Sequence, residues 1–240
     1  MVMKKKTNLN LEGLNLPISL DVESVSFATK IHNILRMAII TGGLSPGQTI
    51  SEIEISRKFA ISRQPVREAF ILLGQERLIE AVPNRGTYVR KISVREVLDS
   101  CFVREVIELA IVKEVTEKHD AKLIRQLRRN VAQQERVKAA ENKAFLELDE
   151  EFHHLLAQHA GRDFAWEVTE RVKSQLNRVR FLTYDHPTPK SSLVSQHTEI
   201  VDAIESGDVL ASEQKMRHHF AEIYRSLPIV AQEYPDYFAP

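Results

Sequence analysis

The stretch ISRQPVREAF, residues 61–70, decides the fold of the amino-terminal part of the chain. Ser62 is a residue type that often precedes a helix, and Pro65 then lies in the first turn, where a backbone N–H has no intrahelical partner. Arg63 and Arg67 are four residues apart and therefore share one face. The apolar residues repeat with the helical period: Val66, Ala69, Phe70 and Leu73. The stretch predicts a helix with a buried apolar side and a cationic amino-terminal end.

The neighbouring sequence predicts the elements around this helix. Apolar residues with helical spacing indicate an earlier helix that ends at residues 42–43, a Gly-Gly pair. Ser51, followed by Glu54, has the capping-box pattern and predicts a second helix that runs to about Phe59. After the quoted stretch, LIEAV and TYVRK flank the turn PNRG, which is typical of a β-hairpin. Three helices and a small hairpin form the layout of a winged helix-turn-helix domain, which we place at residues 24–92.

Such a domain inserts the start of its third helix into the DNA major groove. Arg63 and Arg67 can donate to guanine edges or phosphates, and Gln64 can read a base. A solvated arginine pair is common on any helix, so the pair alone would be an ordinary surface feature. The turn, the hairpin and the local charge together favour DNA binding.

Charge and composition narrow the class of protein further. Residues 1–91 hold 13 Lys+Arg and 8 Asp+Glu, a net charge of +5, so of the 33 residues of each sign the rest holds 20 and 25, a net charge of −5. The amino-terminal part can therefore face a polyanion. The sequence has no apolar run of membrane-spanning length, no apolar run typical of a signal peptide follows the lysines at residues 4–6, and Cys101 is the single cysteine. We expect a soluble cytoplasmic protein in a reducing compartment, without a membrane partner.

The remaining sequence predicts an all-α bundle at residues 93–228, so the expected fold is mainly α. Its amphipathic segments lie near residues 94–118, 121–139, 143–160, 163–184, 190–206 and 209–226. Residues 1–23 are polar and aperiodic, which predicts a flexible arm, and residues 229–240 are assigned as a carboxy-terminal tail.

Three of these segments carry histidines on inward-facing edges. Asp149 and His153 are four residues apart beside one apolar stripe, His197 lies within another, and His219 flanks a third. One carboxylate and three imidazoles can bind a divalent metal. A histidine on an apolar face is, however, more often a hydrogen-bonded core residue. Spacing alone leaves both interpretations open.

The segment from LSPGQ to GTYV resembles the GntR-family winged helix in its PG turn, its SR-x-PVREA helix and its PNRG wing. The resemblance implies DNA contacts by Arg63 and Arg67 on the recognition helix and by Gly86 at the wing tip. Many members have a polar or basic residue early in the second helix, where this chain has Ile53. We assign DNA contacts to Ser62, Arg63, Gln64, Arg67, Arg85 and Gly86.

The bundle resembles the FCD type of ligand-binding domain found in many GntR regulators. The resemblance lies in the D-x3-H pattern of DEEFH, the interval from His197 to His219 and the SGD turn between them. It implies that Asp149, His153, His197 and His219 bind a divalent metal ion, with zinc first and nickel, manganese or iron as alternatives. Several segments also resemble repressors that lie beside sugar-acid dehydratase genes.

A metal with open coordination positions could bind a small carboxylate or hydroxy acid. Arg104 and Arg180, at the edges of apolar faces, are candidates for pairing with such an effector, and Asn177 is a further candidate. Arg104 could equally pair with Glu108.

We therefore expect a ligand-responsive repressor that binds a pseudo-palindromic double-stranded operator as a homodimer, with a sugar acid or small carboxylate as effector. A metal-dependent enzyme is one alternative, although the sequence contains none of the common catalytic motifs. An architectural DNA-binding dimer without an effector is the other.

Overall fold

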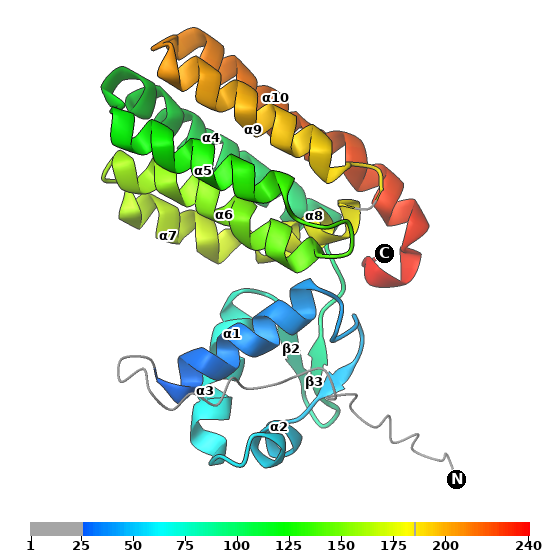
Figure 1. The fold of residues 1–240 in the computed structure, drawn as a ribbon. Helices are drawn as coiled ribbons and strands as arrows, with labels where there is room; N and C mark the ends of the chain where they lie inside the picture. Colours follow the sequence, from blue (N-terminus) through cyan, green and yellow to red (C-terminus); the bar gives the residue numbers. More distant parts are fainter. Residues whose placement is uncertain (1–25, 185) are drawn as a thin grey trace. The chain divides into compact units, whose positions relative to one another are not determined.

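A computed structural model describes residues 26–184 and 186–240 (Figure 1). The chain divides into two compact units. The first unit holds the chain up to Ile92 together with Asp236–Pro240, and the second holds Ser93–Pro235. The expected arm at residues 1–23 lies outside the described residues.

The first unit has the predicted helices and hairpin, with one strand more than predicted. Its described elements are α1 (Phe27–Ile40), β1 (Thr49–Ile50), α2 (Glu52–Lys58), α3 (Arg63–Gln75), β2 (Ile79–Val82) and β3 (Gly86–Val89). The central strand, β3, pairs antiparallel with β2 and with β1, so that Thr49 is opposite Tyr88. The additional strand joins the turn before α2 to the wing.

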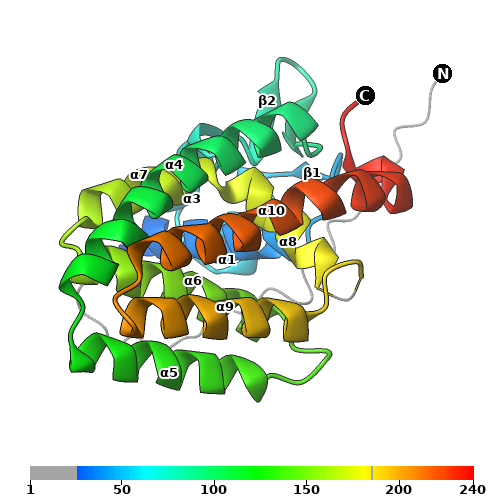
Figure 2. The same ribbon diagram turned by 90° about the horizontal axis from the view of Figure 1, so that it is seen from above.

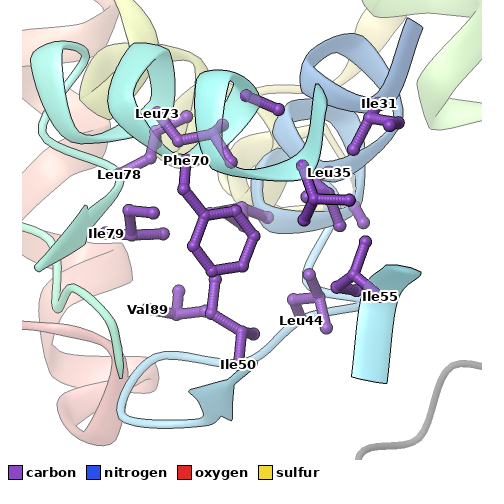
Figure 3. Close-up of a cluster of buried hydrophobic side chains, with 14 residues drawn as sticks. Ile31, Leu35, Leu44, Ile50, Ile55, Phe70, Leu73, Leu78, Ile79 and Val89 are labelled. Carbon is purple, nitrogen blue, oxygen red and sulfur yellow. The ribbon is translucent and has the colours of Figure 1, made fainter. Parts of the chain in front are cut away.

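One apolar cluster holds the first unit together (Figure 3). Leu35 of α1, Ile55 of α2 and Leu73 of α3 are fully buried in it, and Val89 of β3 packs into the same cluster from the sheet. Each such side chain contributes roughly 1.5–3 kcal/mol through burial. The cluster orients α3 with its apolar face inward, so the opposite face of α3 lies in solvent.

Helix α3 begins where the sequence predicts. Ser62 is the N-cap residue with an extended backbone, and Ala60 makes the preceding turn with a φ of 52°. The side chains of Ser62 and Ser51 make no capping hydrogen bond, so the predicted capping box of Ser51 and Glu54 is wrong although α2 starts there. The first turn of α3 therefore presents amide groups that its N-cap side chain does not satisfy, a setting that favours anions.

Residues 229–240, assigned as a tail, contain regular structure and contacts with Ile92. The last helix continues to Glu233, and Pro235–Tyr237 form a short 3-10 turn. The backbone N–H of Ile92 donates to the carbonyl of Tyr237 at 2.8 Å, and the N–H of Ala239 donates to the carbonyl of Ile92 at 2.8 Å. Phe238 is buried. These final residues therefore belong to the first unit.

The second unit is all-helical in its described residues. Its helices are α4 (Val94–Lys118), α5 (Ala121–Glu135), α6 (Asn142–His159), α7 (Asp163–Val172), α8 (Ser174–Thr183), α9 (Lys190–Glu205) and α10 (Val209–Glu233). The single helix predicted at residues 163–184 is two helices that meet at Lys173. The ammonium of Lys173 is buried against the carboxylates of Glu150 and Glu170 and lies 4.0 Å from the centroid of the Trp166 ring.

Helix α4 lies alongside α10 in the bundle (Figure 2). It contacts α6, α7, α8, α9 and α10, whereas α5 packs against α6 and α9. This arrangement brings the inner faces of α4, α6, α9 and α10 together in the middle of the unit. Among the described residues, no helix combines the length and the apolar character needed to cross a bilayer.

Candidate metal centre and nucleic-acid interface

The bundle gathers Asp149 and His153 of α6, His197 of α9 and His219 of α10 into one buried cluster. Each residue offers one ligand atom, and these atoms lie within 4.8 Å of one another. The exposed fractions of the four residues are 1%, 2%, 0% and 6%. The inward faces predicted from periodicity thus converge, and the cluster has the composition of a divalent metal site.

The Nδ1 atom of each histidine faces a polar partner. His153 Nδ1 lies 2.6 Å from Glu108 Oε2. The amide oxygens of Gln134 and Gln196 lie 2.8 and 3.0 Å from Nδ1 of His197 and His219. Amide oxygens accept hydrogen bonds, so Nδ1 of His197 and of His219 carries the proton and Nε2 keeps its lone pair. Metal-binding histidines are oriented in this way.

The other ring nitrogens point into the cluster. Nε2 of His153 lies 3.9 Å from Asp149 Oδ2, and Nε2 of His197 lies 3.7 Å from Asp149 Oδ1. Both Nε2 atoms are buried without a hydrogen-bond partner. Buried polar atoms are nearly always satisfied, so two unsatisfied imidazole nitrogens beside a carboxylate fit a metal ion as the missing partner.

Burial favours the metal-binding form of these histidines. It lowers the pKa of His197 and of His219 well below the usual range, and the neighbouring imidazoles lower both values further. Burial also lowers the pKa of His153, although the Glu108 carboxylate opposes this shift. The rings are therefore neutral near pH 7, which is the form that binds a metal.

The predicted effector residues lie beside the cluster. Arg104 and Arg180 line a cavity of about 40 Å³ together with Asp149 and His219. The Arg180 guanidinium pairs with the carboxylates of Asp149 and Glu150. Asn177 does not line the cavity; its amide oxygen accepts a hydrogen bond from Arg180 at 2.9 Å.

Arg104 makes the ion pair that the sequence left open as an alternative. Its Nε lies 2.7 Å from Glu108 Oε1, and its guanidinium lies 4.8 Å from the centroid of the Phe220 ring. Burial raises the pKa of Glu108, but the charge of the Arg104 guanidinium, together with the nearby His153 imidazole, outweighs burial and holds this pKa well below its usual range. Glu108 therefore stays ionised and joins the arginine to the metal cluster.

Sequence reasoning missed the polar residues around the cluster. Gln134 of α5 and Gln196 of α9 are buried, although glutamine is usually a surface residue. Tyr184 and Thr183, which line the cavity, were also missed. The inward position of Gln134 on the apolar side of α5, after Leu127 and Val131, was the available signal.

The assigned DNA-contacting residues lie on two exposed parts of the first unit. The side chains of Arg63 and Arg67 are 55% and 58% exposed on α3, where Gln64 donates to Glu68 at 2.9 Å. Ser62 is exposed at the start of α3. Arg85 and Gly86 are exposed at the tip between β2 and β3, where Gly86 has a φ of 110° that favours glycine. The structure thus presents a cationic helix start and a wing tip to solvent.

A three-helix unit with a wing, joined to a helical bundle with a buried Asp and three His, defines a winged-helix regulator with a second, all-helical domain. Residues 27–89 match the bacterial regulatory proteins of the gntR family, and residues 99–222 match the FCD domain. The chain therefore belongs to the GntR family of transcriptional regulators, in the group with an FCD domain. Regulators of this family bind DNA, so the chain is a transcriptional regulator rather than an enzyme.

Curated relatives agree with this assignment. The chain is 38% identical over 211 residues to the HTH-type transcriptional repressor RspR of Escherichia coli K12, an alignment that covers 88% of this chain and 92% of the relative. It is 24% identical over 195 residues to a Paenarthrobacter nicotinovorans protein described as "Probable D-xylose utilization operon transcriptional repressor", with 81% and 85% of the two chains covered.

Solved structures show the same fold. Escherichia coli McbR/YncC superposes with a TM-score of 0.73 at 16% identity over 88% of this chain and 99% of that chain. A GntR regulator from Rhodococcus sp. RHA1 superposes with a TM-score of 0.69 at 26% identity over 82% of this chain and 95% of that chain.

Proposed function

We propose that this regulator is a ligand-responsive repressor of a catabolic operon for a sugar acid or another small carboxylate. The observation that carries the proposal is the buried cluster of one aspartate and three histidines beside a cavity with two arginines. The relative in Escherichia coli K12 is a repressor, and the name of another relative refers to D-xylose utilization. The first name supports repression, and the second supports control of a carbohydrate operon.

The operator contact follows from the exposed face of α3. We infer that Arg63, Gln64 and Arg67 read base edges in the major groove, while Ser62 and the start of α3 contact a phosphate. Arg85 and Gly86 reach the DNA backbone from the wing tip. The exposure of both regions supports this assignment.

The metal site follows from the donor set. We infer that Asp149, His153, His197 and His219 hold a divalent ion, with zinc first and nickel, manganese or iron as alternatives. The unsatisfied Nε2 atoms of two of these histidines support this inference. When bound, the ion supplies coordination positions for an oxygen-donating ligand.

The cavity supports a small acid as effector. Arg104 and Arg180 can pair with a carboxylate, and hydroxyl groups on the walls can bond hydroxyls of a ligand. The hydroxyl-bearing residues are Thr183, Tyr184, Thr188 and Ser226. At about 40 Å³ the cavity has room for only a few water molecules, each of which needs roughly 10–15 Å³. A sugar acid must therefore move lining side chains, which links binding to conformation and requires a coupling of only ~1–3 kcal/mol.

An apolar stripe on α4 supports the homodimer. Val94, Leu98, Phe102 and Val106 repeat every four residues, and their exposed fractions are 39%, 39%, 67% and 55%. Two α4 helices related by a two-fold axis between positions 98 and 102 would place Leu98 on Phe102 of the second copy, with Arg95 near Glu105.

Phe102→Glu should give a monomer in sedimentation equilibrium, and Phe164→Glu, at an exposed site on α7, should not.

The proposal is tested by comparing His219→Ala with His218→Ala, because His218 is the exposed neighbour. We expect elemental analysis to find one metal ion per wild-type chain, loss of metal in His219→Ala and retention in His218→Ala. A panel of sugar acids and hydroxy acids should then include one that stabilises the wild type by about 2.7 kcal/mol at a hundredfold excess over Kd and releases the operator. Absence of metal and of any stabilising acid would reject the proposal and support the architectural dimer.

A further inference from the structure

One carboxylate holds both arginines of the exposed α3 face. Nη2 of Arg63 lies 3.1 Å from Oε2 of Glu52, and Nε of Arg67 lies 3.6 Å from the same oxygen. Glu52 is the first residue of α2, and its side chain is 24% exposed. The contact therefore joins the start of α2 to the cationic end of α3.

This contact is not needed to hold the two helices together. Ile55 of α2 and Val66 of α3 are fully buried in the apolar cluster, which already connects α2 to α3. Ion pairs whose arginines are more than half exposed stabilise a fold very little. A carboxylate between two DNA-facing arginines also weakens the attraction of this surface for phosphate. Its position therefore calls for a role other than stability.

We propose that Glu52 is a positioning residue that gives Arg63 and Arg67 their preference for the operator over other DNA; this inference rests on the proposed contact of both arginines with bases. A guanidinium has five donors in a rigid plane, and Glu52 faces Nη2 of Arg63 and Nε of Arg67. The remaining donors can still reach guanine acceptors. Pre-orientation of the plane reduces the conformational entropy that each arginine loses on binding.

On DNA that lacks the correct bases, the arginines must turn to phosphates. They then leave Glu52, and the carboxylate is left beside the phosphate backbone, where like charges repel each other. Glu52 thus penalises the non-specific complex more than the operator complex, because the operator complex keeps the contact. Discrimination through such a repulsive element is a general route to specificity.

The experiment compares full-length wild type with Glu52→Gln, which removes the charge but keeps the shape of the side chain. The operator is first selected from random duplexes with the wild-type protein, and a scrambled duplex of the same composition serves as non-specific DNA. We expect Glu52→Gln to bind the scrambled duplex about tenfold more tightly, to lose about tenfold in the ratio of operator to scrambled affinity, and to show a steeper salt dependence of scrambled binding. Thermal unfolding should not change.

Glu54→Gln is the matched control, because it makes the same charge change at an exposed position of the same helix that does not bond the arginines. An equal loss of discrimination in Glu54→Gln would show a general charge effect and overturn the proposal. An unchanged affinity ratio in Glu52→Gln would overturn it as well. Arg67→Ala distinguishes failure of the proposed DNA contact from failure of the proposed role of Glu52. If Arg67→Ala binds the selected operator as tightly as wild type, the DNA contact itself is wrong.

Discussion

The two units of the chain hold their arginines in opposite ways. Arg63 and Arg67 of the first unit are more than half exposed and share one carboxylate. Arg104 and Arg180 of the second unit are 6% and 7% exposed and are enclosed by the carboxylates of Asp149, Glu108 and Glu150. The exposed pair is available to a large polyanion, whereas the buried pair can be reached only by a small ligand.

This difference separates binding from stability. An exposed charge stays solvated in the free protein, so its removal affects the partner more than the fold. A buried charge has lost its water and depends on the groups that surround it, so removal of one partner leaves the other uncompensated. Substitutions of charged residues should therefore have their largest effects on stability in the second unit.

The largest effect is expected for Glu108→Ala. This change leaves the buried guanidinium of Arg104 without its partner at 2.7 Å and should lower the free energy of unfolding by ~3–5 kcal/mol. Because the pKa of Glu108 is depressed, its contribution is present above the usual value of 4.5 and is lost as the pH falls below it. Urea unfolding at pH 7 and at pH 4 should show the stability difference between the two proteins shrinking in acid.

Glu105→Ala is the control for this prediction. Glu105 lies on the same helix and pairs with Arg217 at 3.0 Å, but the arginine side chain is 58% exposed. Its removal should lower the free energy of unfolding by under ~1 kcal/mol. Equal losses in the free energy of unfolding for Glu105→Ala and Glu108→Ala would contradict the distinction between exposed and buried ion pairs.

Local signals were sufficient to predict most of the helices and failed where distant contacts decide. Ser62 and Pro65 predict the start of α3, because a helix start depends on its own first turn. The two residues of β1 become a strand only through their pairing with β3, which no local pattern contains. Helix α7 ends at Lys173 within a continuous apolar period, and the buried ammonium of Lys173 pairs there with the partly exposed carboxylates of Glu150 and Glu170, a contact that no local pattern contains. Helix α10 continues past Pro228, where a proline usually ends a helix.

The same limit applies to the candidate site. Periodicity predicts which side of its helix His219 faces, and that prediction separates it from His218, which is exposed. Periodicity does not predict that α6, α9 and α10 meet at one point; that expectation came from the resemblance to the FCD domain. Gln134 lies on a helix that supplies no ligand of the cluster, so only the packed structure shows its contact with His197.

The next prediction concerns metal affinity and an uncharged buried residue. We expect Gln134→Leu to weaken metal binding, which tests whether a buried neutral side chain contributes to the second unit as the buried charges do. The Gln134 amide accepts from Nδ1 of His197 at 2.8 Å and donates to Asn130 at 2.7 Å. Loss of such a partner typically weakens metal binding about 10- to 100-fold. Competition with a chelator of known affinity measures the change, and Gln133→Leu, at the exposed neighbouring position, should bind metal as wild type does. Equal metal affinities of Gln134→Leu and wild type would mean that the ring of His197 is oriented by other contacts.

The smallest effect is expected for Arg128→Ala, which tests the exposed side of the comparison within the second unit itself. Nη2 of Arg128 on α5 lies 2.6 Å from Oδ1 of Asp202 and 2.5 Å from Oε2 of Glu205, both on α9, and the three side chains are 40%, 58% and 51% exposed. Since water solvates all three charges when the contacts are absent, the substitution should lower the free energy of unfolding by no more than ~1 kcal/mol. The difference should decrease further as salt is raised from about 0.05 to 0.5 M, because the screening length shortens. A salt-independent loss as large as that of Glu108→Ala would show that position in the bundle, rather than access to water, determines what an ion pair contributes.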